Sequence, residues 1–573
     1  MSGPRIERRV VAQDAPLLGD LHPVLARVFA ARGVRTPAEL DVSLGGLLRT
    51  DSLGGITRAT GLLADAVRND RRIVIVADFD ADGATSCAIA IRALRACGAS
   101  HVDFVVPNRF EYGYGLTPPI VDLVREKGAD LLITVDNGIS SLDGVVAAKQ
   151  AGMLVLITDH HLPGAQLPAA DAIVNPNVPG DDFPSKSLAG CGVIFYVMLA
   201  LRSKLRDDGW FAQQHLREPN FAELLDLVAL GTVADVVPLD VNNRRLVAQG
   251  IARIRAGRAC AGIAALLRVG GKEASRLLAS DLGYAVGPRL NAAGRMADMS
   301  LGIECLVSDD PARCLKIAGE LDALNQERRA IEREMKSQAL DQVLQALPSR
   351  GELPHGICVF DPGWHQGIVG VVAGRVKEIY HRPVIAFAVA GDGELKGSGR
   401  SIPGVHIRDV LDTVAAGSPE LLSRFGGHAM AAGLALPVAR FAEFAAAFDR
   451  VVAATVAPEL LAQVLLTDGE LRPNEMTLDL ARLLSTAAPW GQAFPEPLFD
   501  GEFTIRQRRV VGSDHLKLDL ETAGRVFQAI AFNAADAPWA GNAPRIHAAY
   551  RLSVNEWQGV ERLQLVIEYA EAR

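Results

Sequence analysis

The sequence has few cysteines, and their spacing suits neither a disulfide framework nor a zinc site. The seven cysteines among 573 residues are odd in number and never form a Cys-x-x-Cys pair. Free thiols that are not organised for pairing are typical of proteins in a reducing compartment. We therefore expect the chain to be cytoplasmic and expect no structural zinc.

A long hydrophobic run is also missing. The most apolar stretch, residues 191–201, is too short to cross a bilayer and predicts a buried helix instead. The first sixteen residues mix charged and apolar side chains without a continuous hydrophobic core, so we expect no secretory signal. These features predict a protein without membrane association.

Positive charge is not in excess. The formal net charge is -8 at pH 7, which argues against a surface coated with basic residues for nucleic acid. A local basic channel stays open as a possibility, because electrostatic attraction depends on how charges are distributed rather than on their sum.

From about residue 51, short apolar runs alternate with helical segments, and this alternation predicts a parallel sheet covered on both faces. Overall, 49% of the residues are hydrophobic, which is enough for several well-packed domains. The predicted strands are 72–77, 101–106, 131–135, 154–157 and 172–174. The predicted helices between them are 85–97, 118–127 and 142–151.

Acidic and imidazole side chains follow three of these strands. Asp78, Asp80 and Asp82 alternate at the end of the first strand, where residues two apart point to one side. Asp136 follows the third strand, and Asp159-His160-His161 follows the fourth. Open α/β sheets bind ligands beyond the carboxyl ends of their strands, so we expect these residues on one rim.

A further acid, Asp235, interrupts the apolar run 230–238 and needs a positive partner. Taken singly, each residue has another interpretation: Asp136 could cap a helix, either histidine could belong to the core, and Asp235 could pair with an arginine. Together they favour a binuclear site, because mixed carboxylate and imidazole ligands without a thiolate suit Mn²⁺ or Mg²⁺.

The sequence pattern changes twice in the second half of the chain. Asp310-Pro311 begins a long helix reaching about residue 347, which is either a spacer across a cleft or a helix lying on the first domain. Its charged interior, residues 326–334, is expected to be solvated. A second α/β lobe follows, in which Gly426-Gly427-His428 is expected to precede an Ala-rich helix and to offer N–H groups to an anion.

From about residue 465 five strand-like runs, 499–509, 516–520, 525–532, 546–554 and 563–569, predict an OB-type barrel. Basic and aromatic side chains in such barrels contact phosphates and bases. The candidates are Arg506, Arg508, Arg509, Lys517 and Phe527, with Phe532 and Trp557 near them in the sequence. Phe527 and Phe532 could instead fill the barrel.

An ordered set of motifs resembles the DHH phosphoesterases, and within them the single-strand-specific 5′ to 3′ exonucleases. The set comprises residues 78–83, 107–116, 135–138, 159–161, 231–235, 287–295 and 426–433, the last being similar to the signature of the DHHA1 domain. The resemblance implies a parallel-sheet DHH domain, a long connecting helix, a smaller α/β DHHA1 domain and an OB-like domain. The expected limits are 1–49 for an N-terminal helical segment, then 50–308, 309–348, 349–455 and 456–573.

The resemblance also implies an activity: metal-dependent hydrolysis of single-stranded DNA from its 5′ end to mononucleotides, in DNA repair and recombination. We expect two divalent ions, held by Asp80, Asp82, Asp136, His160 and Asp235, with Asp78 an additional ligand or a nearby acid. His161 would donate to the scissile phosphate, and Asp159 would orient an imidazole.

The substrate contacts are expected from both lobes. Arg109, Ser398 and Arg400 resemble a pocket for a terminal 5′-phosphate, and the remaining phosphate contacts would come from Arg289, Asn291 and His428. The expected partners are single-stranded DNA, a single-strand-binding protein and a helicase, with the chain itself a monomer. Two other functions stay open: hydrolysis of short oligonucleotides or cyclic dinucleotides, and a non-catalytic replication scaffold.

Overall fold

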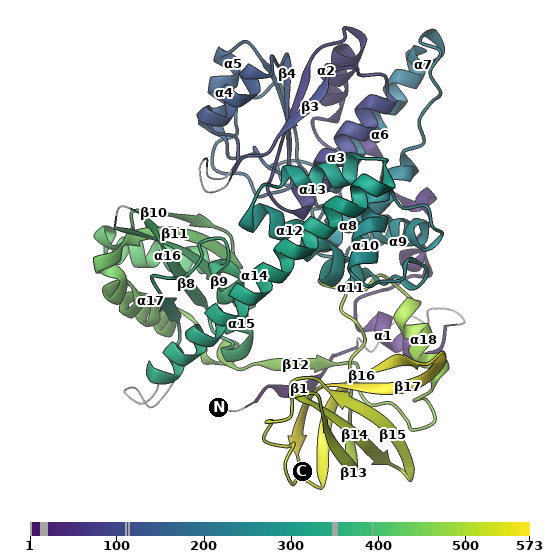
Figure 1. Ribbon diagram of the computed structural model, residues 1–573, viewed down its shortest axis with the longest axis vertical. Helices are drawn as coiled ribbons and strands as arrows, with labels where there is room; N and C mark the ends of the chain where they lie inside the picture. The colour runs from purple at the N-terminus through teal and green to yellow at the C-terminus, as the bar shows by residue number, and fades with distance from the viewer. Residues whose placement is uncertain (1–2, 12–20, 109–111, 113–114, 347–352, 392) are drawn as a thin grey trace. The chain divides into compact units, whose positions relative to one another are not determined.

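The computed structural model describes residues 3–11, 21–108, 112, 115–346, 353–391 and 393–573 (Figure 1). The chain forms two compact units. The smaller unit contains residues 1–7 and 325–466, and the larger contains 8–324 and 467–573. Most of the smaller unit, residues 325–466, is therefore inserted in the sequence of the larger one.

A five-stranded parallel sheet lies at the centre of the larger unit, in the order β3-β2-β4-β5-β6. Its strands are β2 (Ile73–Ala77), β3 (Val102–Val105), β4 (Leu131–Val135), β5 (Leu154–Thr158) and β6 (Ala172–Val174). All five predicted strands are confirmed, with ends that differ by one residue at most. Because strand residues alternate between faces, Ile73 and Ile75 join one hydrophobic cluster while Val74 and Val76 join another.

Helices cover both faces of this sheet (Figure 1). One face carries α2 (Ile56–Arg68), α3 (Ala81–Ala96) and α6 (Gly190–Asp207), and the other carries α4 (Pro118–Glu126) and α5 (Leu142–Gln150). The predicted buried helix at 191–201 is thus the apolar part of α6. The predicted helix at 85–97 begins four residues earlier than expected, because Asp80 caps it.

A helical region follows the sheet in the chain. It consists of α7 (Trp210–Gln213), α8 (Leu225–Ala234), α9 (Val241–Arg255), α10 (Ala261–Val269), α11 (Ala279–Asp281), the π-helical turn η6 (Leu282–Val286), α12 (Gly287–Met296) and α13 (Ser300–Val307). The first part of the apolar run 230–238 is therefore the end of helix α8 and not part of the sheet, and Asp235 is the residue that caps the helix.

The N-terminal segment contains a strand as well as the predicted helical pieces. The amphipathic helix expected there is α1 (Pro23–Ala30), and the Thr36-Pro37 start leads only to a short 3₁₀ turn, Pro37–Leu40. The strand β1 (Arg5–Arg8) pairs with β12 (Val464–Thr467). The sequence did not reveal this strand, because its partner lies far away in sequence.

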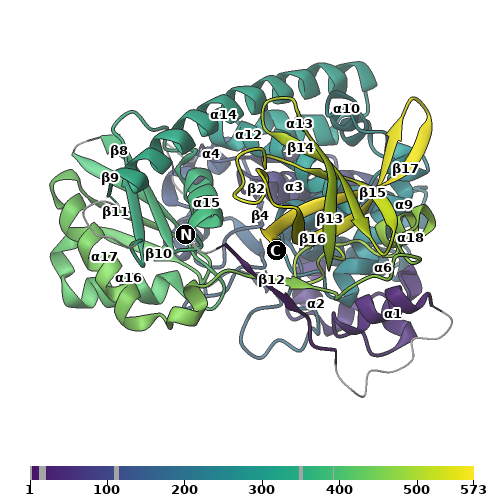
Figure 2. The same ribbon diagram turned by 90° about the horizontal axis from the view of Figure 1, so that it is seen from below.

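The last part of the larger unit is a closed five-stranded barrel in the order β13-β14-β15-β17-β16 (Figure 2). Its strands are β13 (Phe499–Val511), β14 (His515–Thr522), β15 (Arg525–Ala531), β16 (Arg545–Trp557) and β17 (Val560–Ala572), preceded by helix α18 (Leu478–Thr486). The predicted OB-like barrel is confirmed.

The smaller unit contains a mixed sheet in the order β10-β11-β9-β8-β7. Its strands are β7 (Ile357–Phe360), β8 (Val384–Gly391), β9 (Glu394–Arg400), β10 (Arg424–Gly427) and β11 (Ala431–Pro437). Helix α15 (Val369–Tyr380) packs on β8 and β9, whereas α16 (Ile407–Gly417) and α17 (Phe441–Thr455) share one hydrophobic cluster with the sheet.

The glycine-rich motif at 426–433 does not begin a helix, so that prediction is wrong. It forms a hairpin of β10 and β11, in which Gly426 pairs with Gly433. The small residues suit close backbone approach, since a Cβ on Gly427 would lie 2.5 Å from the carbonyl oxygen of Ala431.

The predicted long helix is α14 (Pro311–Ala346), and it runs through the boundary between the units at residue 324. Its charged interior is only partly solvated, contrary to expectation. Asn325, Arg328 and Glu332 are buried, and Glu332 forms ion pairs with Arg328 and with Arg375 of α15. Among the helices that the structure describes, none is both long and apolar enough to cross a membrane.

Candidate metal centre and nucleic-acid contacts

The loop after β2 carries three acids that bend around the start of α3. Asp80 caps the helix by accepting hydrogen bonds from the N–H groups of Asp82 and Gly83, at 2.9 and 3.0 Å. Asp78 accepts from the N–H of Phe79 at 2.7 Å, and Asp82 points the other way, toward the start of α6. The alternation predicted from an extended chain is therefore replaced by a helix cap.

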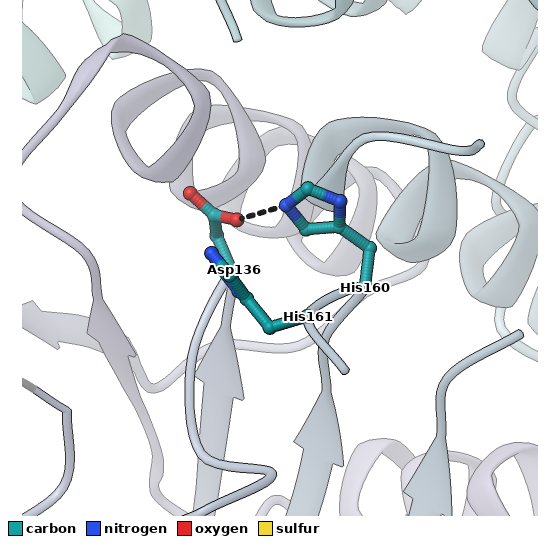
Figure 3. Close-up of side chains that lie close together, drawn as sticks. All are labelled: Asp136, His160 and His161. Atoms are coloured by element: carbon teal, nitrogen blue, oxygen red, sulfur yellow. Dashed lines mark ion pairs between the residues drawn. The ribbon is translucent and has the colours of Figure 1, made fainter. Parts of the chain in front are cut away.

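Asp136 and His160 face each other from the ends of β4 and β5 (Figure 3). The His160 Nε2 lies 3.1 Å from Asp136 Oδ1, 3.5 Å from Asp235 Oδ2 and 4.0 Å from Asp82 Oδ2. Asp136 holds a left-handed backbone with φ of 61°, which is uncommon outside glycine and turns its carboxylate into the site. Acids from the first turn of α3, from the end of β4 and from the C-terminal cap of α8 therefore converge on one imidazole.

Asp159 organises both histidines. Its Oδ1 lies 2.7 Å from His161 Nδ1 and accepts from the backbone N–H groups of His160 and His161, while Oδ2 accepts from the N–H of Ile139. Although burial opposes both shifts, this contact lowers the pKa of Asp159 and raises the pKa of His161 to about 9. His161 therefore carries a positive charge at neutral pH.

Three other acids of the site, Asp78, Asp136 and Asp235, have raised pKa values. Burial, and then the charges of Asp82 and Asp80, raise the pKa of Asp136 and of Asp235 well above the ordinary range. Burial and the charge of Asp80 do the same for Asp78. Several buried carboxylates near one another need protons or bound cations to be stable.

The donor set fits divalent metal ions. Oxygen and nitrogen atoms lie within 4.8 Å of one another in three groups: Asp136 with His160 and His161, Asp82 with His160 and Asp235, and Asp78 with Asp80 and Asp136. Asp136 Oδ1 and His160 Nε2 are buried and face each other at 3.1 Å as an ion pair, but neither atom makes a hydrogen bond among the described residues. Buried polar atoms of this kind indicate a bound group, and carboxylate with imidazole suits Mn²⁺ or Mg²⁺.

Helix α6 contributes to the centre in a way that the sequence did not reveal. The N–H groups of Gly190 and Cys191, at its first turn, donate to Asp82 at 2.6 and 3.0 Å. A Cβ on Gly190 would lie 2.7 Å from the side chain of Asp136, so only glycine fits. The only sign of this contact in the sequence is the pair of glycines that flank Cys191, since glycine permits close approach of a helix to the acids.

Two predicted phosphate-binding residues of the larger unit have partners within the protein. Asn291 Oδ1 accepts from the N–H of Ala81 at 2.8 Å, so it supports the metal-centre loop. Arg289 is 9% exposed and pairs with Asp322 of α14 at 2.7 Å. Arg109 lies outside the described residues.

In the smaller unit, Ser398 and Arg400 lie on the same face of β9, and the Arg400 guanidinium donates to Ser398 Oγ at 3.1 Å. The first turn of α15 meets them there, since a Cβ on Gly370 would lie 2.8 Å from each side chain. This glycine, absent from the prediction, brings a helix N-terminus to the pair. His428 lies in the hairpin turn, where its N–H donates to Ala431.

The candidate nucleic-acid contacts of the barrel differ in whether their side chains are exposed and unpaired. Arg506 pairs with Glu521, and Arg508 donates to the carbonyls of Ala540 and Ala543. Phe527 is 7% exposed and fills the barrel, which was its alternative interpretation, whereas Phe532 is 54% exposed and Trp557 is 74% exposed.

Lys517 remains a candidate for contact with nucleic acid, and Arg509 lies beside it. It lies directly opposite Arg509 in the β13–β14 pairing, so both side chains share one face. In the part of the chain that the structure describes, neither has an ion pair. The prediction of a basic surface on the barrel therefore rests best on this pair.

Three family models match the chain in the predicted order: "DHH family, N-terminal domain" at residues 72–232, "DHHA1 domain" at 354–454 and "RecJ OB domain" at 467–569. The chain is 52% identical to the single-stranded-DNA-specific exonuclease RecJ of Escherichia coli strain K12, over 98% of each chain. The chain belongs to the RecJ family. The RecJ of Thermus thermophilus is more distant, at 32% identity over 94% of this chain and 74% of that protein.

Solved RecJ structures agree with this assignment. The crystal structure of Thermus thermophilus RecJ in complex with Mn²⁺ superposes with a TM-score of 0.81 at 29% identity, covering 99% of this chain and 79% of that one. The complex with Mg²⁺ gives 0.75 at 28% identity, covering 99% and 78%. The predicted family and fold class are confirmed, and the relatives' names agree with the predicted enzyme class.

Proposed function

We propose that this chain is a metal-dependent exonuclease that hydrolyses single-stranded DNA from its 5′ end to mononucleotides, in DNA repair and recombination. The observation that carries the proposal is the buried pair Asp136 and His160, whose facing atoms have no hydrogen-bond partner among the described residues, at the rim of a RecJ-type sheet. The resemblance supplies the 5′ polarity and the mononucleotide product.

Asp80, Asp82, Asp136, His160 and Asp235 would hold two divalent ions, Mn²⁺ or Mg²⁺, with Asp78 an additional ligand or a nearby acid. Such a pair of ions activates water and stabilises charge on the leaving oxygen of a phosphodiester. The chain's own contribution is to fix these ligands. Asp80 does so as a helix cap, and Asp82 through two N–H groups of α6.

His161 would donate to the scissile phosphate. Its ring is held through Nδ1 by Asp159 at 2.7 Å, and its pKa of about 9 keeps it protonated near neutrality. A positively charged donor beside the metal centre stabilises the negative charge that builds on the phosphate oxygens. Asp159 is then the residue that orients the imidazole.

Arg109, Ser398 and Arg400 would bind the terminal 5′-phosphate, and Arg289, Asn291 and His428 would complete the phosphate contacts. Arg400→Ala should weaken the preference for 5′-phosphorylated over 5′-hydroxyl ends by about 10-fold or more, because a charge-assisted hydrogen bond is lost. Competition between the two ends measures this preference. An unchanged ratio would remove Arg400 from the pocket, and Arg408→Ala, at an exposed position on α16, is the control.

The function itself is tested with single strands labelled at either end, incubated with Mn²⁺ or Mg²⁺ beside duplex controls. We expect immediate release of the 5′-labelled mononucleotide, slow loss of the 3′ label and little cutting of duplex. Rapid release of the 3′ label would overturn the polarity. Cutting confined to dinucleotides would instead favour a hydrolase of short oligonucleotides, and binding without cutting would favour a scaffold.

Beyond single-stranded DNA, we expect a single-strand-binding protein and a helicase to be partners. We also expect the enzyme to be a monomer in the cytoplasm. The domain limits given above stay predictions; the matched models at 72–232, 354–454 and 467–569 lie within three of them.

A further inference from the structure

Helix α12 packs against the loop after β2, which carries three of the candidate metal ligands. Asn291 of α12 accepts a hydrogen bond from the N–H of Ala81 at 2.8 Å, and Ala81 lies between two of these ligands. The approach is close, because a Cβ on Gly294 would lie 1.7 Å from the carbonyl oxygen of Phe79. The backbone of α12 therefore supports this loop directly.

The first residue of α12 contacts a second ligand-bearing segment, the end of α8. A Cβ on Gly287 would lie 3.1 Å from Ala234 Cβ, and Ala234 is the last residue of α8. The next residue, Asp235, is the candidate ligand whose Oδ2 lies 3.5 Å from His160 Nε2. One short helix therefore packs against two separate segments of the metal centre, so a displacement of α12 would move ligands from both.

Helix α12 is itself held by the long helix α14. Arg289 of α12 donates to the carbonyl oxygen of Ala285, and its guanidinium forms an ion pair with Asp322 of α14 at 2.7 Å. The side chain of Arg289 is 10% exposed and that of Asp322 is 20% exposed. Because water and salt screen such a pair little, loss of one partner leaves the other charge largely uncompensated. The pair therefore ties α12 to α14 more firmly than an exposed ion pair would.

We propose that Asp322 and Arg289 form a clamp that holds α12 against the metal centre and so sets the affinity of that centre for its divalent ions. The contacts form one series, from Asp322 through Arg289 and α12 to the N–H of Ala81. The inference rests on the proposed metal-dependent function and assigns positioning residues to the same site. Asp322 lies outside every sequence motif described above, whereas Arg289 and Asn291 have this role in addition to their proposed phosphate contacts.

The test measures binding of Mn²⁺ to the full-length protein in the absence of DNA. Calorimetric titration of the metal-free protein gives the Kd for Mn²⁺, and hydrogen exchange gives the protection of the Ala81 amide. The variants are Asp322→Ala, Arg289→Ala and their combination, with Asn291→Ala at the other end of the series. Asp322→Asn keeps the size of the side chain and a neutral acceptor, so it reports on the clamp even where an alanine variant fails to fold.

We expect each single alanine variant to raise the Kd for Mn²⁺ by about 10-fold or more, the effect of losing a group that holds metal ligands from outside, and to speed exchange of the Ala81 amide. The double variant should be no worse than either single one, because the two residues act in series. Asp322→Asn should give a smaller rise. In Asp322→Ala excess Mn²⁺ should restore kcat, with KM for single-stranded DNA unchanged, whereas a residue that only stabilised the fold would lower Tm without this rescue.

Three results would overturn the clamp. One is an unchanged Kd for Mn²⁺ in both single variants, and another is an additive effect in the double variant. The third is a lower KM for DNA in Asp322→Ala at an unchanged Kd, which would mean that Asp322 only neutralises Arg289. Asp309→Ala is the matched control, because it removes the partner of Arg92, also 2.7 Å away, and it should leave the Kd unchanged. If the wild type binds Mn²⁺ but cuts no strand, the proposed nuclease function fails, and the titration still decides the clamp.

Discussion

The side chains of the candidate metal centre are positioned individually by local backbone structure. Asp80 accepts N–H groups as a helix cap, Asp136 uses a left-handed backbone, and Asp159 accepts three N–H groups and one imidazole. Such preorganisation costs stability, because buried like charges repel. Bound cations offset this repulsion. Substitution of one of these residues should therefore weaken cation binding.

Asp136→Ala should abolish hydrolysis, by more than about 100-fold in kcat, while leaving binding of single-stranded DNA largely intact. The reason is that the Asp136 carboxylate pairs with His160 Nε2 at 3.1 Å, closer than Asp235 or Asp82, and belongs to two of the three candidate ligand groups. Release of labelled nucleotide and fluorescence anisotropy measure the two properties. Normal turnover would refute the metal assignment; Asp122→Ala, at an exposed acid on α4, should retain full activity.

Asp500 allows a prediction for pH. Although burial opposes the shift, hydrogen bonds from Arg8, Thr467 and His547 hold the pKa of Asp500 below its ordinary value. A carboxyl whose pKa is lower in the folded state stabilises the fold above its unfolded pKa of about 3.9, and this stabilisation is lost as pH falls through the folded value.

Asp500→Asn should therefore cost about 1–3 kcal/mol at pH 7, and the deficit against wild type should shrink below about pH 4. Thermal unfolding across this range measures the difference. A deficit independent of pH would mean that packing, and not charge, is lost. Asp479→Asn, whose side chain is 92% exposed, provides the comparison and should change stability little at any pH.

At the scale of elements, the sequence was informative wherever one segment carried its own pattern. The central strands were predicted closely because Ile73 to Ala77 is apolar on both faces, as a strand between two helical layers must be. The run ending at Asp235 was not assigned to a helix, since it is apolar all round and shows no period. The hairpin of β10 and β11 was missed because its sequence is rich in glycine and alanine, which are uncommon in strands.

The residues of the candidate site also fall into those that the sequence predicted and those that it did not. Residues that follow strands were predictable, because the carboxyl ends of parallel strands meet at one edge. The hydrogen bonds from Gly190 and Cys191 to Asp82 were not, since they depend on how α6 packs against α3. The barrel arginines were predicted from residue type alone, and only the structure reveals that Arg506 already has an acidic partner.

The β13–β14 pairing leads to a prediction about salt. Arg509→Ser with Lys517→Ser should weaken binding of single-stranded DNA and reduce the slope of log K against log salt by about 0.7 for each lost phosphate contact. Titrations at several salt concentrations measure the slope. Arg506→Ser should change it less, because Glu521 already neutralises that guanidinium. Equal slopes in the double variant and wild type would exclude the basic pair from binding.

For the whole molecule, cations should act as part of the fold of the larger unit. Mn²⁺ at about 100 times its dissociation constant should stabilise the protein by about 2.7 kcal/mol for each site filled, because it relieves the repulsion among buried acids. Thermal unfolding with and without the ion, after treatment with a chelator, measures the effect. The stabilisation should be reduced in Asp136→Ala; an equal shift there would place the stabilising ion elsewhere.

Two ion pairs of the larger unit join distant parts of the chain. Arg8 binds Asp500 and Arg32 binds Asp468, across 492 and 436 positions of sequence. During synthesis, every candidate metal ligand from Asp78 to Asp235 is made well before these two acids. The metal centre can therefore assemble on the nascent chain while the N-terminal segment still waits for its partners. Because domains generally fold in the order of synthesis, we expect the sheet with its candidate ligands to fold before these two ion pairs anchor the N-terminal segment.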